Sequence, residues 1–491
     1  MNFLMKSYMK DRIIKLTFYH KYLVYKPKGM LAFRSLSVQR AFSTSSINLA
    51  AAVARKSFNK KSSFDKSKNR KGSGNDKTFK ATILTKNYKN SAKKIDELLI
   101  DNLPSINSEN LDLIKNNFVK YPIDVIKKLH IAGSFKPDQF NELYSQPLTL
   151  FREIEDSKLI EIINNSKTNS SLTNRFIING QSGLGKSTIL SHFHSFALSK
   201  NENNAILFPI SNADLLVDGS SDYKLNPETK KYDQPMYSKT FIQKFKNLNS
   251  DILSKIPLSN EIIPINSNFK PSNNKINGTL LDFVNYSLKA SAIETNSTFA
   301  FKTILEELSK QTVLPVYLTI DNFSAFIQHP LTKYRNTDND RIYFQDFTIA
   351  DLLLKFVSGE KSFAKGAVMV ATCGNHKLKS NGTLDVITGD KSIDEFAYSK
   401  LNNFDYKLAN RLLLNNGIKK FELNKFSFDE CKSLVHHLFK FSLVHNEYDL
   451  ENQISLSNES IVYDKIATQK YLLSGNGNPR LLMNSCILSY A

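Results

Sequence analysis

Residues 179–188 constrain the fold of this chain more strongly than any other segment. They read Asn-Gly-Gln-Ser-Gly-Leu-Gly-Lys-Ser-Thr, and the stretch from Gly180 to Ser187 fits the phosphate-binding pattern G-x-x-x-x-G-K-[ST]. Glycines let a backbone turn tightly enough for successive N–H groups to face phosphate oxygens, and the following helix presents its N-terminal donors to the same anion. The segment therefore predicts a nucleotide site.

The residues on both sides of this segment argue against a chance match. Residues 175–178 are a short apolar run typical of a buried strand, and the apolar residues that follow the loop recur at helical spacing. Strand, glycine loop and helix is the arrangement that the pattern requires. The predicted nucleotide-binding residues are Gly180, Gln181, Ser182, Gly183, Leu184, Gly185, Lys186, Ser187 and Thr188. In such a loop, Lys186 would contact the β- and γ-phosphates, and the Ser187 hydroxyl would ligate Mg²⁺.

A second part of the predicted site follows a strand at residues 313–320, which ends in Asp321. In a parallel sheet, a residue at the carboxyl end of a strand lies beside the phosphate loop, where an acid can hold Mg²⁺ through water. The alternative is a strand that simply turns at an aspartate. Asn322 follows, where many ATP-hydrolysing enzymes have a glutamate that accepts a proton from water, and an amide cannot act as that base. We therefore expect at most a slow GTPase or ATPase.

Three further strands are predicted at residues 205–210, 366–371 and 420–423. Thr372 and Asn375 follow the second of them, where polar side chains can reach a γ-phosphate or an attacking water. Ordinary turn residues at a strand end are an equal alternative. Residues 241–252 and 301–308 have the apolar spacing of helices, and the polar stretches 218–237 and 257–277 are interpreted as surface insertions.

Composition and charge divide the chain into five predicted regions. Residues 1–49 are a mitochondrial transit peptide, because basic residues are spread among apolar and hydroxyl residues, whereas a secretory signal needs one compact apolar run. Residues 50–80 are a basic disordered arm, 81–171 a helical N-terminal region, 172–423 the nucleotide domain, and 424–491 a C-terminal helical lid that begins with a capping box at Ser427 and Glu430.

The positive charge of the chain belongs mainly to its first 80 residues. They hold 19 Lys and Arg against 3 Asp and Glu, which accounts for 16 of the 20 net positive charges. The arm is either an RNA-binding segment or a solvated linker, two equal alternatives. No apolar run approaches the roughly 18 residues of a membrane span, so none is expected.

The cysteines and histidines predict neither a disulfide framework nor a metal site. The cysteines lie far apart, without a C-x-x-C pair, and are interpreted as buried thiols in a reducing compartment. The pairs His192 and His194, and His436 and His437, lack the i,i+4 spacing that places two ligands on one helical face.

The order of these features resembles the death-associated-protein-three family, nucleotide-binding proteins of the mitochondrial small ribosomal subunit. The likeness extends from about residue 134 to the C-terminus and includes the phosphate loop, the Asp321-Asn322 pair, the 366–375 strand and its turn, and the segment Ser-Gly-Asn-Gly-Asn-Pro-Arg-Leu-Leu at 474–482. The resemblance implies an AAA+-like P-loop NTPase core of three layers around a mainly parallel sheet, a C-terminal helical lid, and GTP or GDP with Mg²⁺ in the site. It also implies small-subunit proteins and rRNA as partners in the mitochondrial matrix, and no free homo-oligomer.

Two points stay open within this resemblance. Arg480 falls where related NTPases can place an arginine against the phosphates, although an arginine that faces RNA or solvent is an equal alternative. The chain has no N-K-x-D motif and residues 321–324 do not fit D-x-x-G, so it is not a Ras-type GTPase and ATP stays possible. Competing functions are a free mitochondrial AAA+-like or signalling ATPase and, supported by the basic arm alone, a nucleic-acid-dependent motor.

Overall fold

The computed structural model describes residues 99–107, 114–199, 205–289, 294–373, 382–393, 404–441, 443–444 and 459–487. The chain divides into two units, residues 1–79 and 80–491, and every described residue belongs to the second. The predicted transit peptide, the basic arm and the candidate Asn375 lie outside the described residues.

A five-stranded parallel sheet forms the centre of this unit, which confirms the predicted α/β class with a mainly parallel sheet. The strand order is β11-β3-β10-β7-β4, and every neighbouring pair is parallel. The strands are β3 (Arg175–Asn179), β4 (Ile206–Ile210), β7 (Val316–Ile320), β10 (Gly366–Ala371) and β11 (Lys419–Glu422). All five were predicted. Strand β7 begins at Val316 rather than at residue 313, and Val313 is 76% exposed.

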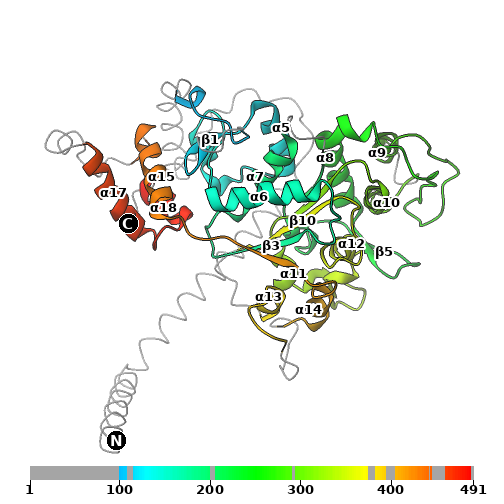
Figure 1. Cartoon of the computed structure of the whole chain (residues 1–491). Helices are drawn as coiled ribbons and strands as arrows, with labels where there is room; N and C mark the ends of the chain where they lie inside the picture. Colours follow the sequence, from blue (N-terminus) through cyan, green and yellow to red (C-terminus); the bar gives the residue numbers. More distant parts are fainter. Residues whose placement is uncertain are drawn as a thin grey trace, which may run out of the picture. The chain divides into compact units, whose positions relative to one another are not determined.

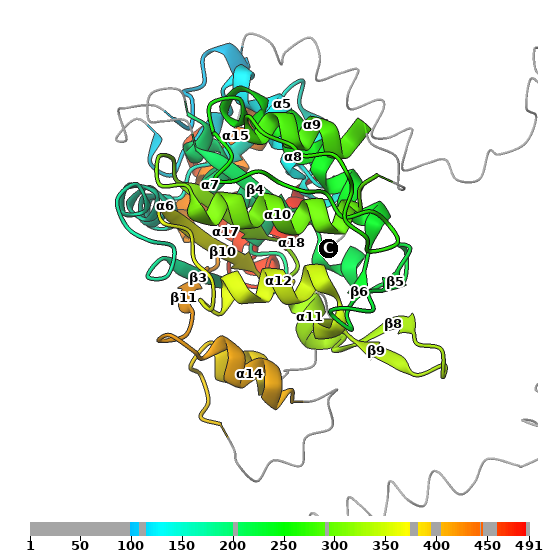
Figure 2. The same cartoon turned by 90° about the vertical axis from the view of Figure 1, so that its right-hand side faces the viewer.

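Side chains alternate between the two faces of the sheet, and both faces are covered by helices. Ile177, Phe208 and Leu318 belong to the apolar cluster on one face, and their neighbours Ile178 and Leu207 belong to the cluster on the other. Continuous apolar strands of this kind are typical of parallel sheets buried on both sides. Figure 1 shows α6 (Glu153–Ser166) and α7 (Lys186–Leu198) beside β3 and β10. Figure 2 shows α10 (Ser297–Lys310) and α12 (Thr348–Val357) along the opposite layer, near α8 (Pro235–Leu253).

The N-terminal region contains strands as well as the expected helices. α5 (Ile123–Ala132) and α6 are accompanied by β1 (Phe118–Lys120) and β2 (Leu148–Leu150), which pair antiparallel. Two single 3₁₀ turns, η1 (Pro137–Gln139) and η2 (Asn141–Leu143), connect α5 to β2. Strands of three residues are too short to produce a periodic pattern, which is why the sequence indicated helix alone.

The two stretches interpreted as insertions contain short β-pairings. In the first, β5 (Lys224–Leu225) pairs with β6 (Tyr232–Asp233), and in the second, single bridges join Ile262 to Ile276 and Ile265 to Pro271. A third hairpin joins β8 (Leu331–Arg335) and β9 (Arg341–Tyr343). The remaining helices of this part are η3 (Ala213–Leu216), α9 (Leu280–Lys289), α11 (Ser324–Gln328), η4 (Phe344–Asp346), α13 (Gly382–Ile387) and α14 (Tyr406–Leu412).

The described C-terminal residues form α15 (Phe428–Lys440), α17 (Glu459–Leu473) and α18 (Pro479–Ile487), and their apolar cluster also includes Ile100, Leu143 and Leu148 of the N-terminal region. The capping box forms as predicted, because Glu430 N donates to Ser427 Oγ at 3.2 Å and Ser427 N donates to Glu430 Oε2 at 2.7 Å. Arg152, which precedes α6, donates from Nε to Glu430 Oε1 at 2.9 Å and so joins the start of α15 to the start of α6.

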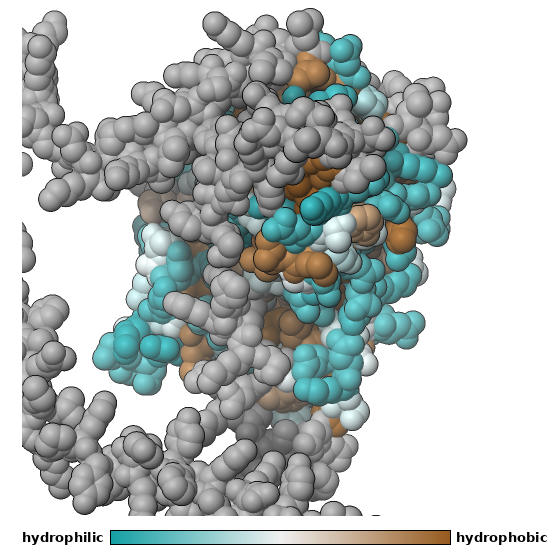
Figure 3. All heavy atoms as spheres, turned by 90° about the vertical axis from the view of Figure 1, so that its left-hand side faces the viewer, coloured by the Kyte–Doolittle hydropathy of each residue, from teal (hydrophilic) through white to brown (hydrophobic). Residues whose placement is uncertain are grey.

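The side that carries these helices mixes apolar and hydrophilic surface (Figure 3). Exposed leucines on α17 and α18 are Leu472, Leu473 and Leu481. Among the described residues, no helix combines the length and apolarity needed to cross a membrane. Cys431 and Cys486 are buried as expected, whereas the prediction was wrong for Cys373, which is only half-buried because it follows the end of β10 at the edge of a cavity.

Candidate functional site

The predicted phosphate loop leaves the carboxyl end of β3 and leads directly into α7. Gly183 and Gly185 have φ values of +83° and +91°, a left-handed conformation that glycine adopts without steric cost. The Asn179 side chain accepts a hydrogen bond from Gly180 N at 2.9 Å and steadies the start of the loop. The sequence pattern therefore produces the tight backbone turn that the prediction required.

Lys186 lies inside the curve of the loop. Its Nζ donates to the carbonyl oxygens of Gly180 at 2.7 Å and Gln181 at 2.8 Å. Burial lowers the pKa of Lys186 to about 8, against smaller opposing effects of Cys373 and Asp321. A buried ammonium with only neutral hydrogen-bond partners gains strongly from a nearby anion, because Coulomb attraction grows in a low dielectric.

Asp321 lies at the same edge of the sheet, two strands from the loop. β10 separates β7 from β3, and the register places Ile320 beside Val370 and Ala371 beside Ile178. The Asp321 carboxylate accepts a hydrogen bond from Asn322 N at 2.8 Å, and its other oxygen forms an ion pair with Lys136 Nζ. Folding thus brings the loop and the acid together as the parallel-sheet argument predicted.

A cavity of about 450 Å³ contains both parts of the site. Ligand pockets in proteins commonly measure about 300–1,000 Å³. The lining includes Lys136, Gln139, Phe140, Ser182, Gly183, Leu184, Gly185, Lys186, Ser187, Thr188, Asn212, Asp214, Asp321, Asn322, Thr372, Cys373, Pro479, Arg480 and Met483. Helix α7, which follows β3, packs on one face of the sheet, and α11, which follows β7, packs on the other. The cavity therefore lies where the connections after the strands diverge to opposite faces. This is the usual position of ligands in open α/β sheets.

Asn322 has a structural role that its position in sequence did not reveal. Its φ of +58° is left-handed, a conformation that asparagine tolerates better than most residues. Its Nδ2 donates to Asn212 Oδ1 at 3.0 Å and to Asp214 Oδ2 at 2.8 Å. The side chain lines the cavity and at the same time ties the end of β7 to the end of β4.

Thr372 also lines the cavity, but its hydroxyl is used within the sheet. Its Oγ1 donates to Ile178 O at 3.2 Å and lies 3.5 Å from Asn179 Oδ1. This geometry favours the alternative of a residue that stabilises the strand ends and, through Asn179, the start of the loop.

The segment before α18 lies against the loop. Asn478 Nδ2 donates to Ser182 O at 2.8 Å, and Arg480 N donates to Gly183 O at 3.1 Å. A Cβ on Gly183 would lie 2.6 Å from Asn478 Oδ1, so only glycine permits this close approach. Arg480 therefore contacts the loop through its backbone, and its side chain lines the cavity.

Several cavity residues escaped the sequence analysis. Asn212 and Asp214 follow the carboxyl end of β4, so the rule that located Asp321 could also have located them. Asn478 lies within the segment 474–482 that resembles the family, and the sequence predicts no role for it. Lys136, Gln139 and Phe140 come from η1 and its flanks, and no local pattern marks them.

The donors present suit Mg²⁺. This ion prefers oxygen ligands and usually takes one or two from the protein with the rest from phosphates and water, and Ser187 and Asp321 offer a hydroxyl and a carboxylate in one cavity. Among the described residues, no three His, Cys, Asp or Glu side chains group closely enough to hold a metal by themselves. His192 lies buried between Asp156 and Thr149, at 2.7 Å from each, and His194 Nε2 lies 2.8 Å from Thr319 Oγ1.

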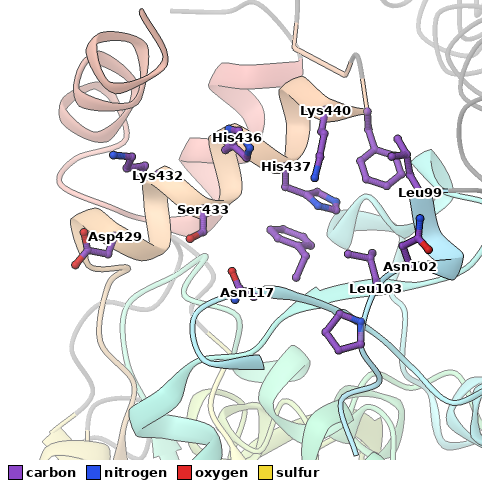
Figure 4. A pocket seen from close by; sticks show the side chains of 13 residues that line it. Leu99, Asn102, Leu103, Asn117, Asp429, Lys432, Ser433, His436, His437 and Lys440 are labelled. Carbon is purple, nitrogen blue, oxygen red and sulfur yellow. The ribbon is translucent and has the colours of Figure 1, made fainter. Parts of the chain in front are cut away.

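A second hollow, of about 630 Å³, is lined by residues of both α15 and the N-terminal segment (Figure 4). His437 projects from α15 into it, and its ring stacks on Phe118 with centroids 3.6 Å apart and planes 7° apart. Burial lowers the pKa of His437 to about 3, and Lys440 and His436 add to this effect. The imidazole is therefore neutral and acts as an apolar contact between the two ends of the described chain.

Together these features define an α/β protein with a candidate phosphate-binding loop at the carboxyl edge of a parallel sheet. The model of the mitochondrial ribosomal death-associated protein 3 family matches residues 149–485, which is more than half of the chain. The chain belongs to this family, which confirms the resemblance and the predicted location in the mitochondrial matrix.

Two curated relatives agree with this assignment. The chain is 25% identical over 380 residues to the small ribosomal subunit protein mS29 of Schizosaccharomyces pombe, a match that covers 75% of this chain and 70% of that protein. It is 23% identical over 376 residues to the protein of the same name in Neurospora crassa, covering 72% and 71%.

Proposed function

We propose that this protein is a structural component of the mitochondrial small ribosomal subunit that holds a purine nucleotide with Mg²⁺ in a P-loop site of the AAA+-like type. The family and the names of the two relatives support the ribosomal role. Small-subunit proteins and rRNA are the proposed partners, and GTP or GDP is favoured over ATP by the family resemblance alone.

The observation that carries nucleotide binding is the meeting of the loop with Asp321 in one cavity. Loop N–H groups and Lys186 supply donors for phosphate, and Ser187 and Asp321 supply oxygens for Mg²⁺. Mg²⁺ would neutralise charge on the phosphates when bound. Lys186 would exchange its carbonyl partners for phosphate oxygens, which removes the cost of a buried ammonium without a counter-charge.

The same geometry supports a site that holds the nucleotide rather than hydrolyses it. Asn322 stands where a catalytic base would be, and both hydrogens of its amide are donated to Asn212 and Asp214. A side chain held in this way neither accepts a proton nor turns readily toward water. Hydrolysis is therefore slow at most, and the nucleotide stabilises the fold by mass action because it binds the folded state alone.

The C-terminal segment adds a reason for a stabilising role. Asn478 and the backbone of Arg480 hold the loop from outside the sheet, so a nucleotide that orders the loop also orders the base of α18. Binding energy is thereby shared between the sheet and the C-terminal helices. A component that must keep one shape within a large particle benefits from such a link.

One experiment tests both parts of the proposal. Mitochondrial lysate is fractionated on a density gradient, and the nucleotide released on denaturation of the purified protein is identified by chromatography. We expect co-sedimentation with the small subunit and release of about one guanine nucleotide for each chain. Sedimentation apart from the subunit with rapid ATP turnover would contradict the proposal and favour the free ATPase.

A further inference from the structure

The ion pair between Lys136 and Asp321 places a second lysine in the nucleotide cavity. Lys136 Nζ contacts Asp321 Oδ2, whereas the other carboxylate oxygen accepts the hydrogen bond from Asn322 N. The two residues are 185 positions apart in sequence. The contact therefore depends on tertiary folding. It engages the carboxylate of Asp321, the residue that the sequence predicts as a Mg²⁺ ligand.

The backbone around Lys136 is held firmly. Lys136 precedes the turn η1, and its N–H donates to Gln139 Oε1 at 3.1 Å while its carbonyl accepts from Gln139 N at 3.0 Å. Pro137 fixes the next φ angle. On the other side, the Phe135 ring packs edge-on against Tyr121 and His130. The ammonium is thus delivered to the cavity from a defined position.

The charges of the cavity make this lysine significant. Lys186 and Arg480 lie on the loop side, whereas Asp214 and Asp321 follow the ends of β4 and β7, where a phosphate would meet two carboxylates. The Asp321 side chain is only 12% exposed, so solvent screens it weakly. Either Mg²⁺ or the Lys136 ammonium must offset this negative charge before phosphate can approach.

We propose that Lys136 is the resident cation of the Asp321 side of the site and makes nucleotide binding largely independent of Mg²⁺. This inference rests on the proposed nucleotide function. An ammonium has three N–H donors, so Lys136 holds Asp321 with one and has donors left for phosphate oxygens. Mg²⁺ needs its own oxygens at about 2.0–2.1 Å and cannot share that face of Asp321 Oδ2 with Lys136. The metal and the lysine are therefore alternatives at Asp321, and Mg²⁺ bound with the nucleotide would take the place of the Lys136 ammonium there.

The test is the Mg²⁺ dependence of affinity. Equilibrium dissociation constants for GDP and ATP are measured with the full chain, freed of nucleotide, in EDTA and in millimolar Mg²⁺. For the unaltered protein we expect Mg²⁺ to change affinity by less than about threefold. In Lys136→Met the EDTA affinity should fall about 30-fold, the size of a lost charge-assisted hydrogen bond, because an unpaired carboxylate then repels the phosphates. Mg²⁺ should restore most of this loss.

A matched control separates this effect from a general loss of positive charge. Lys128→Met removes a lysine of the nearby helix α5 that pairs with Asp251 away from the cavity, and it should leave the Mg²⁺ ratio unchanged. Thermal unfolding verifies that each variant folds. An equal Mg²⁺ ratio in Lys136→Met and the unaltered protein would overturn the inference while the nucleotide site stands. Absence of binding by every protein in both buffers would instead overturn the proposed function.

Discussion

The two sides of the candidate site differ in how they are built. The loop side is one continuous segment whose N–H groups and Lys186 suit an anion. The Asp321 side is assembled from the ends of β4 and β7 and from the turn that carries Lys136, and its carboxylates suit a cation. The loop side thus depends on local backbone geometry, whereas the Asp321 side depends on the strand order.

Each side is also held by a different end of the described chain. The C-terminal segment contacts the loop through Asn478, and the N-terminal region contacts Asp321 through Lys136. These two ends touch each other where His437 stacks on Phe118. A nucleotide between the two sides would therefore link three contacts that are far apart in sequence.

The largest effect is expected on the loop side, from Lys186→Ala. Loss of the buried ammonium removes charge-assisted hydrogen bonds to phosphate, and we expect nucleotide affinity to fall by about 100-fold or more. The melting temperature in the presence of nucleotide should fall with it. Isothermal titration and thermal unfolding measure the two effects. Lys128→Met is again the control, and unchanged retention in Lys186→Ala would remove this residue from the site.

The next effect concerns the contact between the loop and the C-terminal segment. In Gly183→Ala the new Cβ meets Asn478 Oδ1 at 2.6 Å and the Cβ of Arg480 at 2.7 Å, in a left-handed backbone. We expect a loss of about 2–4 kcal/mol in the free energy of unfolding, from strain and overpacking together, and at least tenfold weaker nucleotide binding.

Gly389→Ala supplies the matched control for this substitution. Gly389 has a similar φ of +77°, but no atom lies within 4 Å of the position that a Cβ would take there. It shares the backbone strain and lacks the clash, so the difference between the variants in urea unfolding isolates the contact. Equal losses in the two variants would show that the C-terminal segment does not press on the loop.

A smaller effect is expected on the Asp321 side, from Asn322→Glu. Glutamate restores the base that many hydrolases have at this position, but it must adopt φ near +58° and face Asp214. We expect no gain in hydrolysis and a loss of about 1–3 kcal/mol in stability. Asn322→Gly keeps the backbone conformation and should lose only the side-chain hydrogen bonds. Faster phosphate release by the glutamate variant would show that a missing base alone limits turnover.

The difference between the two sides also explains what could be predicted from the sequence. The loop and the five strands are visible because their signals are local: glycines at fixed spacing and short apolar runs. Asp321 could be placed because strands in a parallel sheet end at one edge. The sheet-edge rule extends to Asn212 and Asp214, which the sequence analysis overlooked.

Other parts of the site could not be predicted, because their roles arise from chain segments that meet only on folding. Lys136 follows a helix that carries no nucleotide signal, and nothing near it in sequence indicates Asp321 as its partner. Asn322 was interpreted as a missing base, while its left-handed backbone and its bonds to Asn212 and Asp214 give the physical reason for an asparagine. Cys373 was expected in the core because free thiols are usually buried, but it is only half-buried because it lines the cavity.

The smallest effect tests the His437–Phe118 stack, one of the contacts that join the two ends that hold the site. The pKa of His437 is about 3 in the folded protein and ordinarily 6.5, so between these values the unfolded chain binds a proton that the folded chain does not. Stability is therefore unaffected above about pH 6.5 and falls as the pH decreases below it, by up to about 1.4 kcal/mol for each pH unit.

The variant His437→Phe keeps a ring stacked on Phe118 and cannot titrate. Urea unfolding at pH 7.5 and 5.5 should show the unaltered protein losing about 1.4 kcal/mol more than the variant. His194, whose pKa burial lowers to about 4, titrates in both proteins and cancels in this difference. If the two proteins lose equal stability, His437 is solvated and the stacking contact between the N-terminal region and α15 does not form. The Arg152–Glu430 ion pair and the shared apolar cluster would then be what joins the two ends.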